Sequence, residues 1–295
     1  MKFLAEYIMR GRIQAMLVAT SLALLSLLMP PISIVSSATV ALVTLRRGAA
    51  EGLYVSLSAS VMAGLMGIIF MGNYQFALAY ALILWLPVWL ISIILREGRH
   101  LSLAVEIAVM FGIISVVAYY LYDPNVASQW QSLLTQVLPV NANAPIEDIT
   151  LAVNTMAHYM TGILAAGTVF SLLFGLFLGR WWQANLYNPG GFKQEYLSLS
   201  TQPKFALGSL CIIAVAALSQ GLIEEIAWNA SILLFVLYSV IGSSVVHTLF
   251  AGMKMARFSV PMFYITLFLI PHALIPVALV GILDAWLNLR KSKSN

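Results

Sequence analysis

The chain has 295 residues, of which 61% are hydrophobic and only 9% are charged, and its mean hydropathy is +0.93. This composition excludes a water-soluble globule, because too few polar groups are present to cover a water-facing surface. The net charge of +4 does not indicate a nucleic-acid partner, since the Lys and Arg residues gather in short clusters at the ends of apolar blocks. The single cysteine, Cys211, excludes an intrachain disulfide or a thiolate metal cluster.

Long apolar blocks dominate the sequence and predict membrane-spanning helices of about 20 residues each. No block has the strict alternation of a β-barrel strand. We therefore expect an all-α, polytopic integral membrane helical bundle, with about 8–10 membrane segments in a single membrane domain over residues 1–295. The expected segments are 13–29, 32–45, 50–72, 75–95, 101–121, 150–178, 205–222, 228–250 and 258–288.

Prolines interrupt the first and last apolar stretches. Pro30 and Pro31 lack backbone donors, so 13–45 is predicted to form a Pro-broken hairpin whose second arm is short or half-buried. The final segment, 258–288, contains three prolines and is too long for one plain helix. A kinked helix and a hairpin turning near "IPHALIP" both fit; the hairpin is preferred because it brings the basic C-terminus to the side of the other basic clusters.

Charged residues predict the orientation in the membrane. If the blocks cross alternately, one side holds the basic clusters and the other holds acidic residues without Lys or Arg. Because basic residues concentrate on the cytoplasmic side, both termini are expected there, in a multi-pass protein of a bacterial cytoplasmic (inner) membrane. The inner basic residues are Arg10, Arg12, Arg46, Arg47, Arg96, Arg99, Arg180, Lys193, Lys204, Lys254 and Arg257. The outer acidic residues are Asp123, Glu147, Asp148, Glu224 and Glu225.

Two connections are long. The outer one, 122–149, contains "ASQWQSLLTQVL", which predicts an amphipathic helix along the membrane surface. Its apolar face consists of Trp130, Leu133, Leu134, Val137 and Leu138. The inner polar loop, 180–204, contains "NPGGFKQEYLSLSTQPK".

The "NPGGF" motif of the inner polar loop predicts a shaped turn. Asn-Pro begins a turn, two glycines permit a positive φ, and the phenylalanine is expected to anchor in the membrane edge. Lys193 and Glu195 would then be held in place for a partner or for an internal ion pair, and a simple capped turn in the aromatic belt fits as well. The candidate docking residues are Asn188, Pro189, Gly190, Gly191, Phe192, Lys193 and Glu195.

Small residues recur at helical spacing in several blocks. Ala15, Ala19 and Ala23 lie four apart in the first block, and Gly175 and Gly179 do so in the sixth. Such rows let another helix approach closely, either within the chain or from a partner membrane protein.

Ionisable and polar groups at membrane depth are costly and are therefore candidate site residues. Asn154, His158 and Tyr159 lie near the outer end of the sixth block, where they would line a cavity or simply meet water. Glu106 is a further pocket candidate, although pairing with Arg99 or Arg96 explains it too.

No motif for catalysis, metal or nucleotide binding occurs: there is no His-Glu-x-x-His, Gly-x-Ser-x-Gly or Walker pattern. The adjacent Glu224 and Glu225 point to different helix faces and do not form an acid–base pair. We expect no enzymatic activity, no cofactor and no metal.

The "NPGGF" loop and the C-terminal "GILDAWLNLRK", with Gly281, Asp284, Trp286 and Arg290, together resemble the YybS-like family of predicted bacterial membrane proteins, a domain of unknown function. The resemblance covers essentially the whole chain, although the segment after Glu195 is less basic than in the family. That family is similar in fold to the substrate-binding subunits of energy-coupling-factor transporters, which dock on a shared energising module.

The resemblance implies a small-molecule-binding subunit with an outward pocket and a membrane-protein partner, docked through the alanine row of the first block and the inner polar loop. The alternative is a non-catalytic membrane scaffold that organises cell-envelope proteins and binds no small molecule. Polar residues converging on an outer cavity would favour the transporter subunit.

Overall fold

The computed structural model describes residues 2–137, 146–252 and 255–290. Helices account for nearly all regular structure in these ranges, and none of the described residues forms a strand. The chain is therefore all-α, as its hydropathy pattern predicts.

Five helical stretches among the described residues are long and apolar enough to cross a membrane, and a bent pair at the end of the chain gives a sixth if it counts as one span. They indicate a multi-pass membrane protein. The number is lower than the predicted total of about 8–10, partly because two apolar blocks form helices shorter than a perpendicular span. The short helices are α2 (Arg12–Leu25) and α11 (Pro203–Leu218). The long stretches are α4 (Ala49–Met71), α5 (Gln75–Tyr80) continued by η1 (Ala81–Trp85) and α6 (Leu86–Gly98), α7 (Leu101–Tyr122), α9 (Ile146–Tyr187) and α12 (Leu222–Ala251).

The chain divides into two compact units, and both α7 and α9 contribute to each of them. Unit 1 comprises Met1–Ala108 and Thr168–Leu199. Unit 2 comprises Val109–Gly167 and Ser200–Asn295. The single membrane domain expected from the sequence stays a prediction.

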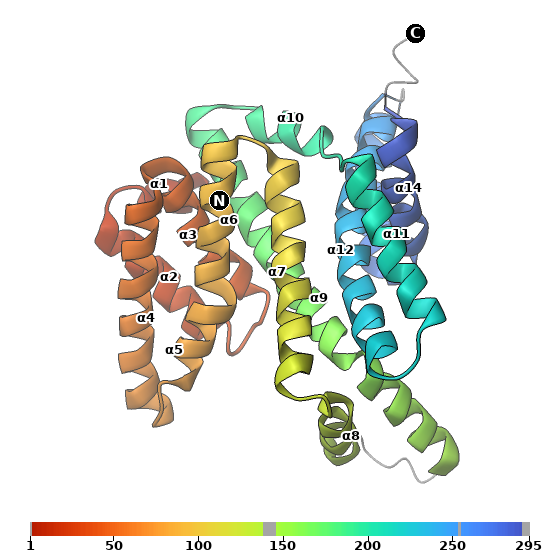
Figure 1. Cartoon of the computed structure of the whole chain (residues 1–295). Coiled ribbons are helices and arrows are strands. Elements are labelled where there is room, and N and C mark those ends of the chain that lie inside the picture. The colour runs from red at the N-terminus through yellow and green to blue at the C-terminus, as the bar shows by residue number, and fades with distance from the viewer. Residues whose placement is uncertain (1, 138–145, 253–254, 291–295) are drawn as a thin grey trace. The chain divides into compact units, whose positions relative to one another are not determined.

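Unit 1 is organised around α3 (Ile32–Arg47), which packs against α2, α4 and α6 (Figure 1). The break before α3 falls at Pro30 and Pro31, as predicted. In the helix that follows, every side chain from Ser36 to Leu45 is buried within the protein. Small residues permit this burial: a Cβ added to Gly179 of α9 would lie 2.7 Å from the Cβ of Ala41 on α3.

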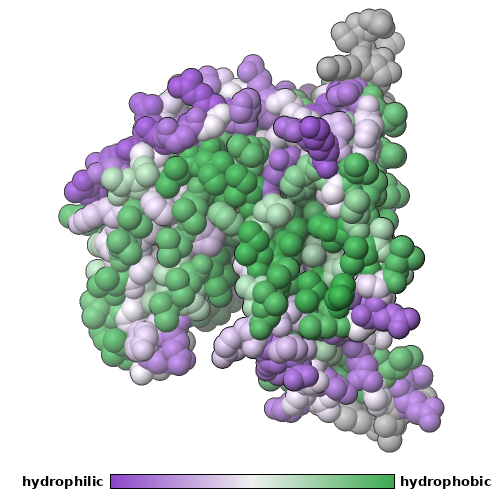
Figure 2. All heavy atoms as spheres, in the orientation of Figure 1, coloured by the Kyte–Doolittle hydropathy of each residue, from purple (hydrophilic) through white to green (hydrophobic). Residues whose placement is uncertain are grey.

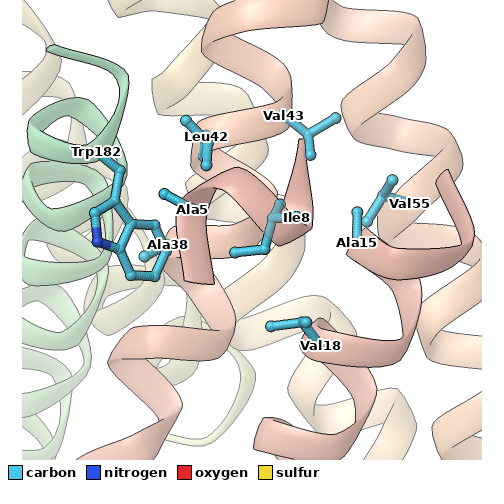
Figure 3. Packing of buried hydrophobic residues seen from close by; sticks show 9 residues of the cluster. All are labelled: Ala5, Ile8, Ala15, Val18, Ala38, Leu42, Val43, Val55 and Trp182. Atoms are coloured by element: carbon cyan, nitrogen blue, oxygen red, sulfur yellow. The ribbon is translucent and has the colours of Figure 1, made fainter. Parts of the chain in front are cut away.

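An apolar cluster joins five helices of unit 1 (Figure 3). Trp182, from the C-terminal part of α9, turns its indole toward Ala38 of α3. Ile8 of α1 (Lys2–Ile8) is fully buried in the same cluster. Dispersion contacts among these side chains hold the short N-terminal helices against the longer ones.

Unit 2 is organised around α12, which packs against α11 and against α14 (Leu274–Leu287). The crossing of α12 and α14 is made by glycines. A Cβ added to Gly242 would lie 1.8 Å from the carbonyl oxygen of Val277, and one added to Gly281 would lie 2.2 Å from that of Tyr238. Backbone therefore meets backbone here, which only glycine permits.

The final apolar segment turns sharply near "IPHALIP", where the sequence predicts a turn. Helix α13 (Ala256–Leu269) is followed by η2 (Pro271–Ala273) and α14, and the two arms are bent by 118°. Pro271 lacks a backbone donor, so the helix ends before it.

The C-terminal motif closes α14. The backbone N–H of Leu289 donates to Asp284 Oδ1 at 2.9 Å, and Arg290 Nη2 donates to Asp284 Oδ2 at 2.7 Å. Asp284 is buried, whereas Trp286 is exposed. Asp284 and Arg290 therefore form an internal cap, and Trp286 remains on the surface.

The amphipathic helix predicted in the outer connection is α8 (Val126–Val137). Leu133 and Val137 are exposed, as expected for a helix lying on a membrane surface. Leu138, Lys254 and the C-terminal residues 291–295, which were discussed above, lie outside the described residues.

Exposed apolar side chains follow the flanks of the helices, and hydrophilic ones gather around helix ends (Figure 2). On α4, Leu57, Val61 and Leu65 are exposed at four-residue spacing, while Ala59 and Ala63 are fully buried. A helix with a bulky apolar outer face and a small-residue inner face fits contact with lipid on one side and protein on the other.

Candidate functional site

A polar cluster lies in unit 2, at the C-terminal end of α7, in the first half of α9 and at the start of α12. The hydroxyl of Tyr120 on α7 donates to Glu225 Oε1 on α12 at 2.7 Å. His158 on α9 places Nδ1 3.6 Å from the second carboxylate oxygen, Glu225 Oε2. One carboxylate therefore joins three helices.

Asn229 supports this carboxylate from one turn further along α12 and is fully buried. Its amide nitrogen, which carries two hydrogens, lies 3.2 Å from the Tyr120 hydroxyl oxygen and 2.8 Å from each of the backbone carbonyl oxygens of His158 and Glu225. Its oxygen accepts from the N–H of Gly162 at 2.5 Å. A Cβ on Gly162 would lie 2.8 Å from the Asn229 Cα, so glycine is what lets α9 reach α12 here.

The cluster keeps unused hydrogen-bonding capacity on its open side. The separation of 3.6 Å between His158 and Glu225 Oε2 is too long for a direct hydrogen bond. Among the described residues, neither His158 ring nitrogen nor Glu225 Oε2 has a hydrogen-bond partner. The side chains of His158 and Glu225 are 30% and 12% exposed, so water or a ligand can reach the gap.

Aromatic rings border the cluster. The ring of Tyr159 forms T-shaped contacts with the rings of His158, with centroids 5.1 Å apart, and of Trp228, with centroids 6.4 Å apart. Outside them, Trp130 of α8 donates to Thr161 Oγ1 at 2.9 Å and ties the amphipathic helix to α9.

The structure brings together some of the predicted pocket residues and not others. His158 and Tyr159 belong to the cluster. Asn154 is exposed and accepts a hydrogen bond from Gln131 of α8 at 2.7 Å. Glu106 lies in the first part of α7, in unit 1, and takes no part in this cluster. Among the described residues, no group of three His, Cys, Asp or Glu side chains is placed to hold a metal.

Three members of the cluster were not singled out from the sequence as pocket residues: Tyr120, Glu225 and Asn229. Glu225 was named there among the outer acidic residues. A usable signal existed, because Glu225 and Asn229 lie four apart and therefore share a face of one helix. An amide within an apolar span is also a reason to look for a polar partner.

The alanine row proposed for docking is buried within unit 1. Ala15, Ala19 and Ala23 are each at most 1% exposed, and Ser36 of α3 donates its hydroxyl hydrogen to the Ala19 carbonyl at 2.7 Å. A partner would have to displace these contacts to reach the row.

The inner polar loop folds back on the end of α9 through α10 (Gly191–Leu197). Gly190 has φ 86°, the left-handed conformation expected of a glycine in this turn. Arg180 of α9 and Glu195 of α10 form a two-pronged ion pair. Phe192 packs against Phe177 with ring centroids 6.0 Å apart. Of the two alternatives for Glu195, the structure has the internal ion pair.

Comparisons of the chain with family models, curated proteins and solved structures find no match. The resemblance to the YybS-like family stays a prediction that rests on the two motifs quoted above.

Proposed function

We propose that this protein is a non-enzymatic, small-molecule-binding subunit of a membrane transporter, located in a bacterial cytoplasmic membrane with both termini in the cytoplasm. The observation that carries the proposal is the half-open pair of His158 and Glu225, whose carboxylate accepts a hydrogen bond from the buried Tyr120. Placing an ionisable group among apolar helices costs free energy, and such groups commonly mark a functional site. Here the buried partners fix the carboxylate while one of its oxygens stays available.

The chemistry of the cluster favours a ligand with a cationic or strongly donating nitrogen. Glu225 supplies the acidic group of the cluster, and its Oε2 has no hydrogen-bond partner among the described residues. A charged donor at Glu225 Oε2 would form a charge-assisted hydrogen bond. The ligand would enter from the side that the basic-residue distribution predicts to be outside the cell.

The test is to identify small molecules that co-purify with the protein in mild detergent, by mass spectrometry of the denatured eluate. Glu225→Gln removes the charge but keeps an acceptor for Tyr120, so the fold is expected to survive. Glu224→Gln is the matched control, because it removes the same charge from the neighbouring position. A ligand retained by the wild type and the control, but lost from Glu225→Gln, supports the proposal; equal retention by all three contradicts it.

Docking on an energising partner is proposed to use the inner polar loop. Lys193 is exposed on α10, whereas Glu195 is occupied by Arg180. Replacing Lys193→Glu is expected to weaken co-purification of a partner protein, with Lys2→Glu as the control at another exposed basic position of unit 1. A partner recovered equally from both variants would exclude this loop.

A scaffold remains the second candidate, and one observation favours it. The hydrogen bonds of Tyr120 and Asn229 are satisfied within the chain, so the cluster also serves to join three helices. If cell-envelope proteins co-purify and no small molecule does, the scaffold is the better account.

A further inference from the structure

A second polar site lies in unit 1 and is independent of the proposed ligand cluster. It is a cavity of about 330 Å³ at the point where α3, α6 and α9 end. Four arginines and one glutamate line it: Arg46, Arg96, Arg99, Arg180 and Glu195. A cavity of this size accommodates a headgroup-sized ligand.

The positive charge of the cavity is only partly compensated. Glu195 is engaged by Arg180, and Arg96 donates to the Leu45 carbonyl at 2.7 Å while lying 3.5 Å from the exposed Glu97. Among the described residues, Arg46 and Arg99 form no ion pair. Net positive charge therefore remains at the opening.

Arg46 and Arg99 are exposed, and Arg46 is held in place by an aromatic ring. Its guanidinium carbon lies 3.9 Å from the ring centroid of Tyr187. This stacking leaves the edge of the guanidinium, with its N–H donors, available. A planar donor set of this kind matches the oxygens of a phosphate group.

The cavity lies at the ends of apolar spans, at the depth expected for lipid headgroups. Arg46 precedes the apolar span of α4, and Arg96 and Arg99 lie between the apolar runs of α6 and α7. Charges at the ends of apolar spans lie at the membrane–water boundary, where basic pockets between helices receive lipid phosphates. Arginines at helix C-termini also interact favourably with the helix dipole, which explains single residues but not four arginines that line one cavity.

We propose that this cavity binds a phosphate group, presented either by the headgroup of an anionic phospholipid or by a soluble phosphate compound. Arg46 and Arg99 supply the binding charge. Arg180, held by Glu195, and Arg96, held by Leu45, form the fixed wall.

The test compares two double variants, each of which removes two positive charges from unit 1. Arg46→Gln with Arg99→Gln removes the exposed pair of the cavity and leaves the Arg180–Glu195 pair intact. Arg10→Gln with Lys2→Gln removes two exposed basic residues that do not line the cavity. Elution in size-exclusion chromatography and melting without ligand establish that both variants fold.

Two probes distinguish the sources of phosphate. Native mass spectrometry compares the adducts formed with anionic phosphatidylglycerol and with zwitterionic phosphatidylcholine. The melting temperature in inorganic phosphate, compared with that in chloride at equal ionic strength, reports the binding of a soluble anion. We expect the cavity variant to bind phosphatidylglycerol at least about ten-fold more weakly than the wild type, and the control variant to resemble the wild type. If inorganic phosphate raises the melting temperature of the wild type and the control but not of the cavity variant, and the wild type shows no preference for phosphatidylglycerol, the ligand is a soluble phosphate. Equal losses in both variants, or no selectivity for either probe in the wild type, overturn the proposal.

Discussion

The glycine crossing of α12 and α14 gives the sharpest prediction about what holds unit 2 together. Replacing Gly242→Ala would put a methyl carbon 1.8 Å from the Val277 carbonyl oxygen, where real Cβ atoms stay beyond 3.0 Å. The helices would have to separate by roughly 1 Å, which forfeits a quarter to a half of each affected dispersion contact. Overpacking of this kind costs about 1–3 kcal/mol, which is larger than the helix-propensity gain of alanine over glycine.

The assay is thermal unfolding in detergent, followed by the loss of the monodisperse peak in size-exclusion chromatography. A net cost of about 1–2 kcal/mol lowers the melting temperature by roughly 2–3 °C in a chain of this size. Gly208→Ala is the matched control: Gly208 lies within α11 of the same unit, and an added Cβ meets nothing within 4 Å. Its melting temperature is expected to stay level or rise. If Gly242→Ala melts no lower than the control, the close backbone approach is refuted.

Three further substitutions test other parts of the chain. Ala19→Leu is expected to lower the stability of unit 1 by about 1–3 kcal/mol, because Ala19 is fully buried. Ala79→Leu is the control at an exposed helical position and should change the stability little. Glu195→Gln breaks the ion pair with Arg180 and should make α10 more accessible to protease. Gln194→Glu, at a neighbouring exposed position, should leave the cleavage rate unchanged. Equal cleavage of the two variants would contradict a stabilising Arg180–Glu195 ion pair. Tyr120→Phe removes the hydroxyl that contacts both Glu225 and Asn229 and should lower the stability by about 1 kcal/mol in the same melting assay. Tyr119→Phe is the control and should change nothing, because the Tyr119 hydroxyl has only a long contact of 3.4 Å to Gln129.

Features set by local sequence were predictable. The proline pair before α3, the turn near "IPHALIP" and the amphipathic helix α8 all follow from residues that are neighbours in the chain. The lengths of the individual helices were not predictable in the same way, because a hydropathy block does not define where a helix ends. The blocks at α2 and α11 are apolar throughout, yet each forms a helix shorter than a span.

The polar cluster could be predicted only in part, because its partners are far apart in sequence. Tyr120 lies 105 residues from Glu225 and 109 residues from Asn229, and helical periodicity does not say which helices meet. The alanine row shows the same limit. Its spacing indicates a close helix contact but not the identity of the second helix, and in the structure the row is buried within unit 1.

The most direct test of the proposed outward-facing site is labelling by a membrane-impermeant maleimide in spheroplasts. The background is Cys211→Ser, which removes the single native thiol. In it, His158→Cys reports on the cluster and Lys193→Cys on the inner polar loop. We predict that His158→Cys reacts in intact spheroplasts and that Lys193→Cys reacts only after the membrane is permeabilised. Reaction of Lys193→Cys from outside, or no reaction of His158→Cys under either condition, would contradict a binding site open to the outside.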